Sequence, residues 1–280
     1  MVHLSIGKIN VNTLRINSLL ISFFSKLKWR DGIFSAYDYV KSFFITPLLG
    51  KEHELSSCEK LVLQHQIPFY QKLSKEQQML FEKRLAIFLD IYTFIGRKGY
   101  VITSETKVCI GSVYIMMTLG MREYLTKVFD KIIVYPCEFF SKAHQRNHKG
   151  EFNFSCRALV FSWKDFIAGF SIEDDNVNLG VHEFMHALSF HGKVSKDYSA
   201  HLFDAMYNDI LAYVMKPAIV HKIRLENYFR AYAFTNSYEF MAVMMENFFE
   251  SPIEFKKRFP RLFAKVVRML NYKAVLNLQS

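Results

Sequence analysis

The chain has 280 residues, of which 51% are hydrophobic and 16% aromatic, and its formal net charge is +10. This composition excludes an intrinsically disordered protein, and the length suffices for one large domain or two modest ones with a real core. The basic residues come without zinc-finger spacing or an RNA-binding aromatic signature, so we expect no nucleic-acid partner. An acidic partner or a membrane surface stays compatible with the charge.

The cysteines indicate a reducing environment. They are widely spaced and form no Cys-x-x-Cys pair, which predicts free thiols in a cytoplasmic protein rather than disulfides or a thiolate metal site. The four are Cys58, Cys109, Cys137 and Cys156. No secretory signal is convincing, and the longest apolar run near the start, Leu19 to Phe24, is too short to span a bilayer.

Residues 1–60 differ from the rest by mixing aromatic and basic side chains, as in the run from Phe23 to Arg30. Pro47 to Gly50 indicates a break in this segment. We expect a helical arm here, followed by the main domain over residues 61–280. The alternative is an amphipathic segment that touches a membrane surface through residues 1–50.

Beyond Ile67–Pro68, helical periodicity alternates with short β-branched runs. Ser74 and Gln77 have capping-box spacing at the start of one helix, and Thr103 or Ser104 can cap the next helix, which ends near Leu119. Strands are expected at 101–103, 130–136 and 158–163, and a polar loop at 147–153. The pattern predicts an α+β fold, mainly helical with a small sheet.

The next helix carries His182-Glu183-Phe184-Met185-His186, a His-Glu-x-x-His pattern. Positions four apart share one helix face, so both imidazoles could bind one metal ion while Glu183 reaches a nearby water. Five residues can match by chance, but the flanks are apolar and predict a buried helix, where unpartnered histidines would be costly. A catalytic zinc site needs a third protein ligand and leaves one position open for water.

A later helix, ending near Glu250, offers that third ligand. Glu239 and Glu246 are seven residues apart on a face that is otherwise apolar, so at least one carboxylate is expected to face the interior. However, Glu239 also follows Asn236 by three residues and could be an ordinary capping-box glutamate. A further capping box is expected where Ser251-Pro252 starts the following helix with Glu254. The residues alone leave the role of Glu239 open.

From about Ile67 to Arg268, the chain resembles the Mlc titration factor A family of zinc-dependent peptidases, which is similar in fold to the catalytic domain of anthrax lethal factor. The resemblance rests on separated motifs in the same order. They are Val134-Tyr135-Pro136, Leu159 to Trp163, Asp175-Asn176-Val177, His182 to His186, Tyr232, Thr235-Asn236, Glu239-Phe240 and Glu246 to Pro252. The resemblance implies a zincin-like, gluzincin-type metallopeptidase domain with the metal motif on a buried helix.

The resemblance also implies the roles of individual residues. His182, His186 and Glu239 would bind Zn²⁺, Glu183 would be general base and acid, and Tyr232 would donate a hydrogen bond in the transition state. Tyr238, next to Glu239, is expected to point away from the site.

One position departs from the family pattern, because Ser189 stands where members usually carry an aspartate that orients a zinc-bound imidazole. Our hypothesis is that Glu246 takes over this orienting role.

These observations predict a cytoplasmic zinc metallopeptidase that acts on peptide or protein substrates, as either an aminopeptidase or an endopeptidase. The alternative is a binding module that sequesters a transcriptional repressor, a partner implied by the resemblance alone. In that case the zinc site would be weakly active or structural.

Overall fold

The computed structural model describes residues 53–141, 144–171, 176–272 and 275. They belong to the unit that spans residues 51–280. Most of the arm expected over residues 1–60 lies outside the described residues, and so does its expected membrane contact. Within the described part, no helix combines the length and the apolar stretch that crossing a membrane requires.

The first helices begin at polar caps that the sequence predicts. Ser74 Oγ accepts a hydrogen bond from Gln77 N, and the Gln77 side chain accepts one from Ser74 N. Thr103 Oγ1 accepts from Thr106 N at the start of the next long helix. Both predicted helix starts are confirmed. The bounds are α3 Ser57–Gln66, α4 Pro68–Gln71, α5 Lys75–Ile91 and α6 Ser104–Thr118.

Short strands follow and interrupt this helical series. Their bounds are β1 Thr93–Gly96, β2 Lys131–Tyr135, β3 Phe139–Ser141, β4 Arg146–His148, β5 Gly150–Asn153 and β6 Ala158–Ser162. Four of them form a sheet in the order β1-β2-β6-β5. The first three strands of this order are parallel, whereas β5 is antiparallel to β6 and lies at the edge. The strands β3 and β4 form a separate antiparallel hairpin.

The sheet confirms two predicted strands, at β2 and β6, and corrects two other expectations. Residues 101–103 are not a strand, because Thr103 ends this stretch as the cap of α6, and Thr93–Gly96 pairs with β2 instead. Residues 147–153 are not a loop, because they contain the end of β4 and all of β5. An edge strand has only one neighbour and carries polar residues, so it lacks the apolar signature of a central strand.

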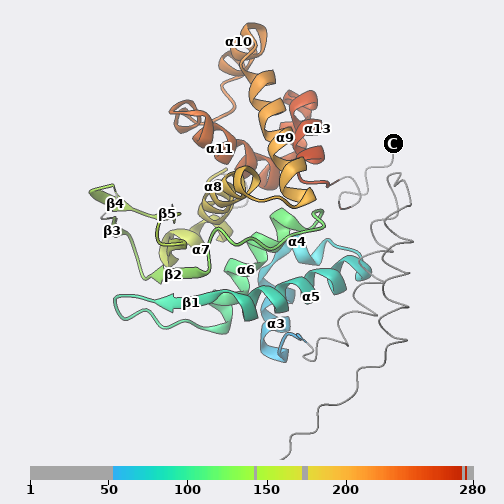
Figure 1. The fold of residues 1–280 in the computed structure, drawn as a ribbon. Helices are drawn as coiled ribbons and strands as arrows, with labels where there is room; N and C mark the ends of the chain where they lie inside the picture. Colours follow the sequence, from blue (N-terminus) through green and yellow to red (C-terminus); the bar gives the residue numbers. More distant parts are fainter. Residues whose placement is uncertain (1–52, 142–143, 172–175, 273–274, 276–280) are drawn as a thin grey trace, which may run out of the picture. The chain divides into compact units, whose positions relative to one another are not determined.

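The remaining helices surround the one that carries the His-Glu-x-x-His motif. Their bounds are α7 Trp163–Ser171, α8 Leu179–Val194, α9 Tyr198–Val214, α10 Pro217–Glu226, the 3₁₀ helix η2 Ala231–Phe234, α11 Ser237–Glu250, α12 Pro252–Arg258 and α13 Pro260–Met269. α8 packs against α6, α9, α11 and β5. Figure 1 shows α8 between α5 and α6 on one side and α9 and α11 on the other.

Two helix boundaries differ from the expectations. Glycine often ends a helix, so the sequence favours an end of the motif helix at His191-Gly192. The helix instead continues to Val194, and Gly192 lies inside it where α9 approaches closely. Ser251 makes no side-chain cap bond at the start of α12, so the expected capping box with Glu254 is wrong. The Ser251 hydroxyl donates instead to Asn176 Oδ1 at 2.6 Å.

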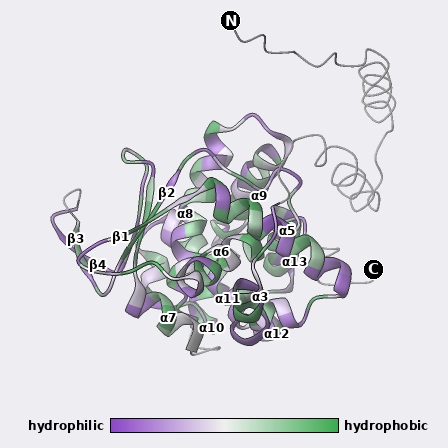
Figure 2. Cartoon of the chain, turned by 90° about the horizontal axis from the view of Figure 1, so that it is seen from below, coloured by the Kyte–Doolittle hydropathy of each residue, from purple (hydrophilic) through white to green (hydrophobic). Residues whose placement is uncertain are grey.

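An aromatic core fixes the orientation of α8. Phe184 is fully buried, with ring centroids 5.2 Å from Tyr114, 5.7 Å from Phe161 and 6.1 Å from Phe129. Burying one such side chain contributes about 1.5–3 kcal/mol. Figure 2 shows hydrophobic stretches gathered around α6, α8 and α11. The fold is therefore the mainly helical α+β arrangement with a small sheet that the sequence predicts.

Candidate metal centre and active site

The motif helix starts at a side-chain cap. Asn178 Oδ1 accepts a hydrogen bond from Val181 N at 3.0 Å, which satisfies one of the free N–H groups at the start of α8. His182 and Glu183 follow directly, and they are only 8% and 7% exposed. The expectation of a buried motif helix is thus confirmed.

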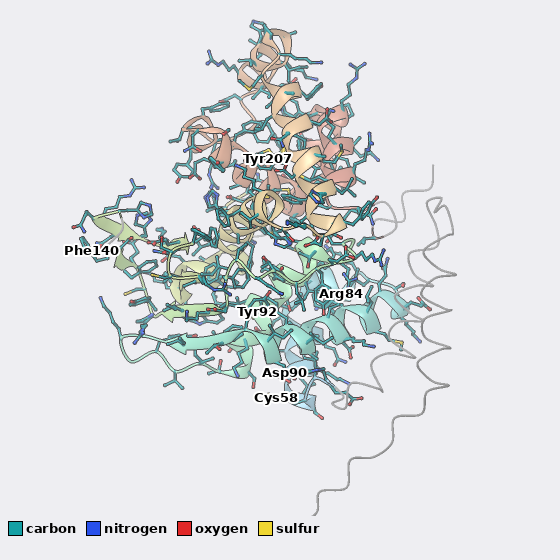
Figure 3. All side chains as sticks on the ribbon, viewed as in Figure 1. Cys58, Arg84, Asp90, Tyr92, Phe140 and Tyr207 are labelled. Carbon is teal, nitrogen blue, oxygen red and sulfur yellow. The ribbon has the colours of Figure 1, made fainter. Side chains whose placement is uncertain are left out.

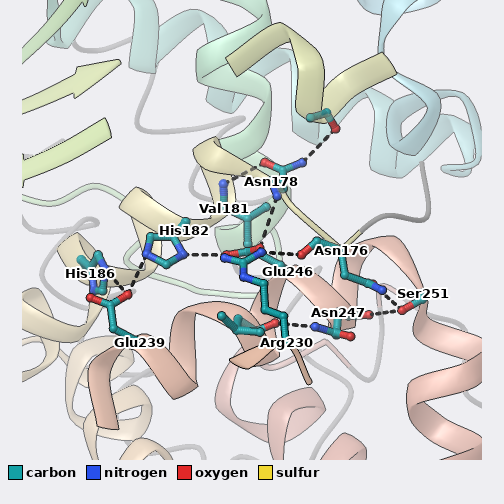
Figure 4. A network of polar contacts seen from close by, with 12 residues as sticks. Asn176, Asn178, Val181, His182, His186, Arg230, Glu239, Glu246, Asn247 and Ser251 are labelled. Carbon is teal, nitrogen blue, oxygen red and sulfur yellow. Dashed lines mark hydrogen bonds and ion pairs between the residues drawn. The ribbon is translucent and has the colours of Figure 1, made fainter. Parts of the chain in front are cut away.

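Three side chains converge between α8 and α11. Glu239 Oε2 lies 2.9 Å from His182 Nε2 and 3.5 Å from His186 Nε2. One ligand atom from each residue can be chosen so that all lie within 4.8 Å of one another. Figure 4 shows the two imidazoles of α8 facing the Glu239 carboxylate of α11. The structure therefore brings together the three residues that the sequence nominates as metal ligands.

The donor set fits a divalent metal ion. Glu239 Oε2 is buried, and two imidazole nitrogens lie near it. Asn236 caps α11 by accepting from Tyr238 N and Glu239 N, while the Glu239 carboxylate faces the imidazoles. One carboxylate oxygen and two imidazole nitrogens that converge in this way are a donor set that zinc binds.

The far side of His182 is held by Glu246, which is fully buried. His182 Nδ1 donates to Glu246 Oε1 at 2.6 Å, a contact that leaves Nε2 directed at Glu239. Arg230 binds the same carboxylate with both Nη atoms, Nη2 to Oε1 at 2.9 Å. Ser189 does not contact an imidazole, because its hydroxyl donates to Met185 O at 2.7 Å. Glu246, and not Ser189, is therefore the side chain that contacts His182 on the side away from Glu239.

Arg230 also links this pair to the segment before α8. Its Nη1 donates to Asn176 O at 2.7 Å, and the Asn176 side chain accepts from the Ser251 hydroxyl. Asn176 has a φ of 56°, a left-handed conformation that asparagine tolerates better than most residues. Figure 4 shows this chain of contacts running from His186 to Ser251. The sequence analysis missed Arg230; its position two residues before Tyr232 was the available signal.

Two pKa values describe the charge balance of the cluster. Burial by itself lowers the pKa of His182, but the contacts with Glu239 and Glu246 outweigh it and raise the pKa to about 10. Burial raises the pKa of Glu239, but the contacts with His182 and His186 outweigh it and hold the pKa well below its usual range. The imidazoles and the carboxylate therefore stabilise each other's charged forms, and a metal ion that binds here would compete with a proton.

Glu183 faces the edge strand β5. A Cβ atom placed on Gly150 would lie 2.7 Å from Glu183 Cγ, so only glycine lets β5 pass this close. Burial raises the pKa of Glu183 above its ordinary value, although the nearby imidazoles oppose the shift. A carboxylate with a raised pKa accepts a proton more readily near neutral pH.

Tyr232, on η2, borders the cluster. Its ring centroid lies 5.8 Å from that of His182, and the side chain is 46% exposed. Burial, followed by the charges of Glu239 and Glu183, raises its pKa, which keeps the phenol protonated and able to donate a hydrogen bond. The neighbouring Tyr238 hydroxyl instead accepts from Lys193 Nζ at 2.8 Å, at the end of α8.

These side chains open into a pocket of about 510 Å³. His182, Glu183 and Tyr232 line one part of it, and Arg146 and His148 of β4 line another. Through His182, the pocket connects the cluster to the outside, and its volume is that of a small-molecule or side-chain binding site.

The fold and the cluster define a class of protein. A mainly helical α+β domain with a His-Glu-x-x-His helix, joined by a glutamate from a later helix, is the arrangement of a zincin-like metallopeptidase. More specifically, the chain belongs to the glucose-regulated metallo-peptidase M90 family, whose model matches residues 49–271. This match confirms the resemblance to the Mlc titration factor A family.

A curated relative is also similar to this chain. It is the uncharacterized protein slr2042 of Synechocystis sp. (strain ATCC 27184 / PCC 6803 / Kazusa), 26% identical over 226 residues. The alignment covers 72% of this chain and 79% of the relative. The similarity thus extends over the greater part of both proteins.

Proposed function

We propose that this protein is a zinc-dependent peptidase whose ligands are His182, His186 and Glu239. The proposal rests on one observation above all: two imidazole nitrogens of a His-Glu-x-x-His helix and a buried carboxylate oxygen of a second helix converge within 4.8 Å of one another. Membership in a metallopeptidase family supports peptide hydrolysis as the reaction class. The four cysteines are free, which supports a reducing, cytoplasmic location.

The chain's own residues supply proton transfer and charge stabilisation. When bound, zinc supplies the Lewis acidity that makes a water nucleophilic near neutral pH. Glu183 takes a proton from the attacking water as the new C–O bond forms, and it returns that proton to the leaving nitrogen as the C–N bond breaks. Tyr232 donates a hydrogen bond to the oxyanion that develops on the substrate carbonyl.

The edge strand β5 supplies a place for the substrate backbone. β5 packs against α8 and pairs with β6 on one side only within the four-stranded sheet. An extended peptide can add to such an edge through main-chain hydrogen bonds, which need no particular sequence. Aminopeptidase and endopeptidase action would use the same catalytic residues. Comparing the hydrolysis of peptides with free and with blocked N-termini will distinguish the two.

The test is hydrolysis of a degenerate peptide library by zinc-loaded wild type and Glu183→Gln. We expect new termini in the mass spectra with wild type, and a loss of about 10²–10⁴-fold with the variant at equal zinc content. Equal hydrolysis by both proteins would contradict the role of Glu183. No hydrolysis by zinc-loaded wild type would contradict the peptidase and favour the regulator-binding module.

A further inference from the structure

The cations that line the pocket differ in how they are paired. Lys149 Nζ lies 2.9 Å from Asp165 Oδ1 and 4.0 Å from Glu138 Oε1. Arg230 is bound to the buried Glu246 carboxylate. The charges of both residues are therefore balanced by acidic groups of the protein itself.

Arg146 has no such partner. No carboxylate among the described residues lies within ion-pair distance of its guanidinium, and Arg146 is exposed to the pocket. Its Nε donates to His148 Nε2 at 3.1 Å. This bond fixes the base of the guanidinium and leaves the two Nη groups as a fork of donors. A cation of this kind on the wall of a pocket attracts an anion from outside the protein.

The local structure holds Arg146 in place. It is paired with Ser141 in the β3–β4 hairpin, next to the left-handed residue Gln145, whose φ is 54°. Burial, together with the charge of Arg146, lowers the pKa of His148, so the imidazole stays neutral and its Nε2 accepts the hydrogen bond. The rim of this hairpin is open, since Phe140 of β3 is 56% exposed (Figure 3).

Arg146 shares its pocket with side chains of the proposed reaction site. Arg146, Glu183 and Tyr232 line the same pocket. A peptide held at Glu183 would therefore bring its neighbouring residues near the guanidinium.

We propose that Arg146 binds a carboxylate of the peptide substrate close to the scissile bond. This inference rests on the proposed peptidase function and names the substrate class of the same site. A planar guanidinium matches a carboxylate through two parallel hydrogen bonds, which a neutral amide cannot reproduce. The carboxylate can belong to an aspartate or glutamate side chain or to the C-terminus of the peptide.

The test uses labelled degenerate hexapeptide pools in matched pairs. One pair differs by glutamate or glutamine at a fixed position, scanned along the peptide, and the other by a free or an amidated C-terminus. Binding is measured by fluorescence anisotropy on zinc-loaded Glu183→Gln, which prevents turnover, and kcat/KM is measured on wild type. We expect the carboxylate member of one pair to be favoured about ten- to hundredfold in both measurements. A preference in the first pair identifies a side-chain carboxylate as the group bound, and a preference in the second pair identifies the C-terminal carboxylate.

The variants decide whether Arg146 is responsible. In the Glu183→Gln background, Arg146→Gln should bring the binding ratio near one, while Arg146→Lys should retain part of it. Arg97→Gln changes an exposed arginine outside the pocket and should leave the ratio unchanged. Equal binding of the carboxylate and amide pools, or a preference that survives Arg146→Gln, would overturn the proposal. Because binding is read without turnover, this result is separate from a failure of hydrolysis.

Discussion

The two walls of the pocket are built in opposite ways. The inner wall, formed by α8 and α11, places buried histidines and carboxylates in a continuous network that ends at Ser251. The outer wall, formed by β4 and Lys149, is largely exposed, and Arg146 has no acidic partner there among the described residues. In the proposed peptidase, the reaction would depend on side chains of fixed geometry, and the substrate would contact a side chain that has no acidic partner of its own.

Among variants that keep Glu183 and the proposed ligands, the largest effect is expected from Tyr232→Phe, which removes one hydroxyl beside the inner wall and leaves the ring. If that hydroxyl donates to the oxyanion, kcat should fall about 10²–10³-fold at unchanged zinc content. Steady-state kinetics with a peptide substrate measures this. Tyr238→Phe is the matched control, because that hydroxyl binds Lys193. Equal losses in both variants would remove the special role of Tyr232.

Gly150→Ala should disturb the contact between Glu183 and β5 while leaving the ligands alone. The added methyl group must push against Glu183 Cγ, and a displacement of about 1 Å in a catalytic group can cost about 10²-fold in rate. The assay is kcat/KM together with zinc content. Gly192→Ala, where the nearest atoms lie at 3.3 Å, should have a much smaller effect. Unchanged kinetics of Gly150→Ala would show that Glu183 needs no fixed position.

A smaller effect on zinc binding is expected from Glu246→Gln. The amide keeps the shape of the carboxylate but loses the charge that orients His182, so zinc affinity should fall about 10- to 100-fold. Competition with a fluorescent zinc chelator measures this. Ser189→Ala is the control and should change affinity less than about twofold, since the Ser189 hydroxyl donates to Met185 O and not to an imidazole. Glu246→Gln with wild-type affinity would rule out the orienting role.

The sequence predicted helices and strands correctly where the residues of a segment determine its structure without help from distant parts of the chain. The capping residues Ser74 and Thr103 and the apolar run of β6 are of this kind. Edge strand β5 was missed because its pairing with β6 depends on the tertiary fold. The same distinction between local and tertiary signals applies to the residues of the site. The spacing of His182 and His186 is a property of one helix, and the structure brings Glu239 to them. The structure adds Arg230 to the site through its contact with Glu246.

The most direct measurement of the central claim is the zinc content and affinity of wild type, Glu239→Gln and Glu105→Gln. Glu105 is an exposed glutamate in the first turn of α6 and is the control. After dialysis in a zinc buffer, elemental analysis should find about one zinc per chain in wild type and control, and almost none in Glu239→Gln. Glu239→Gln that binds zinc as tightly as wild type would contradict the three-ligand site.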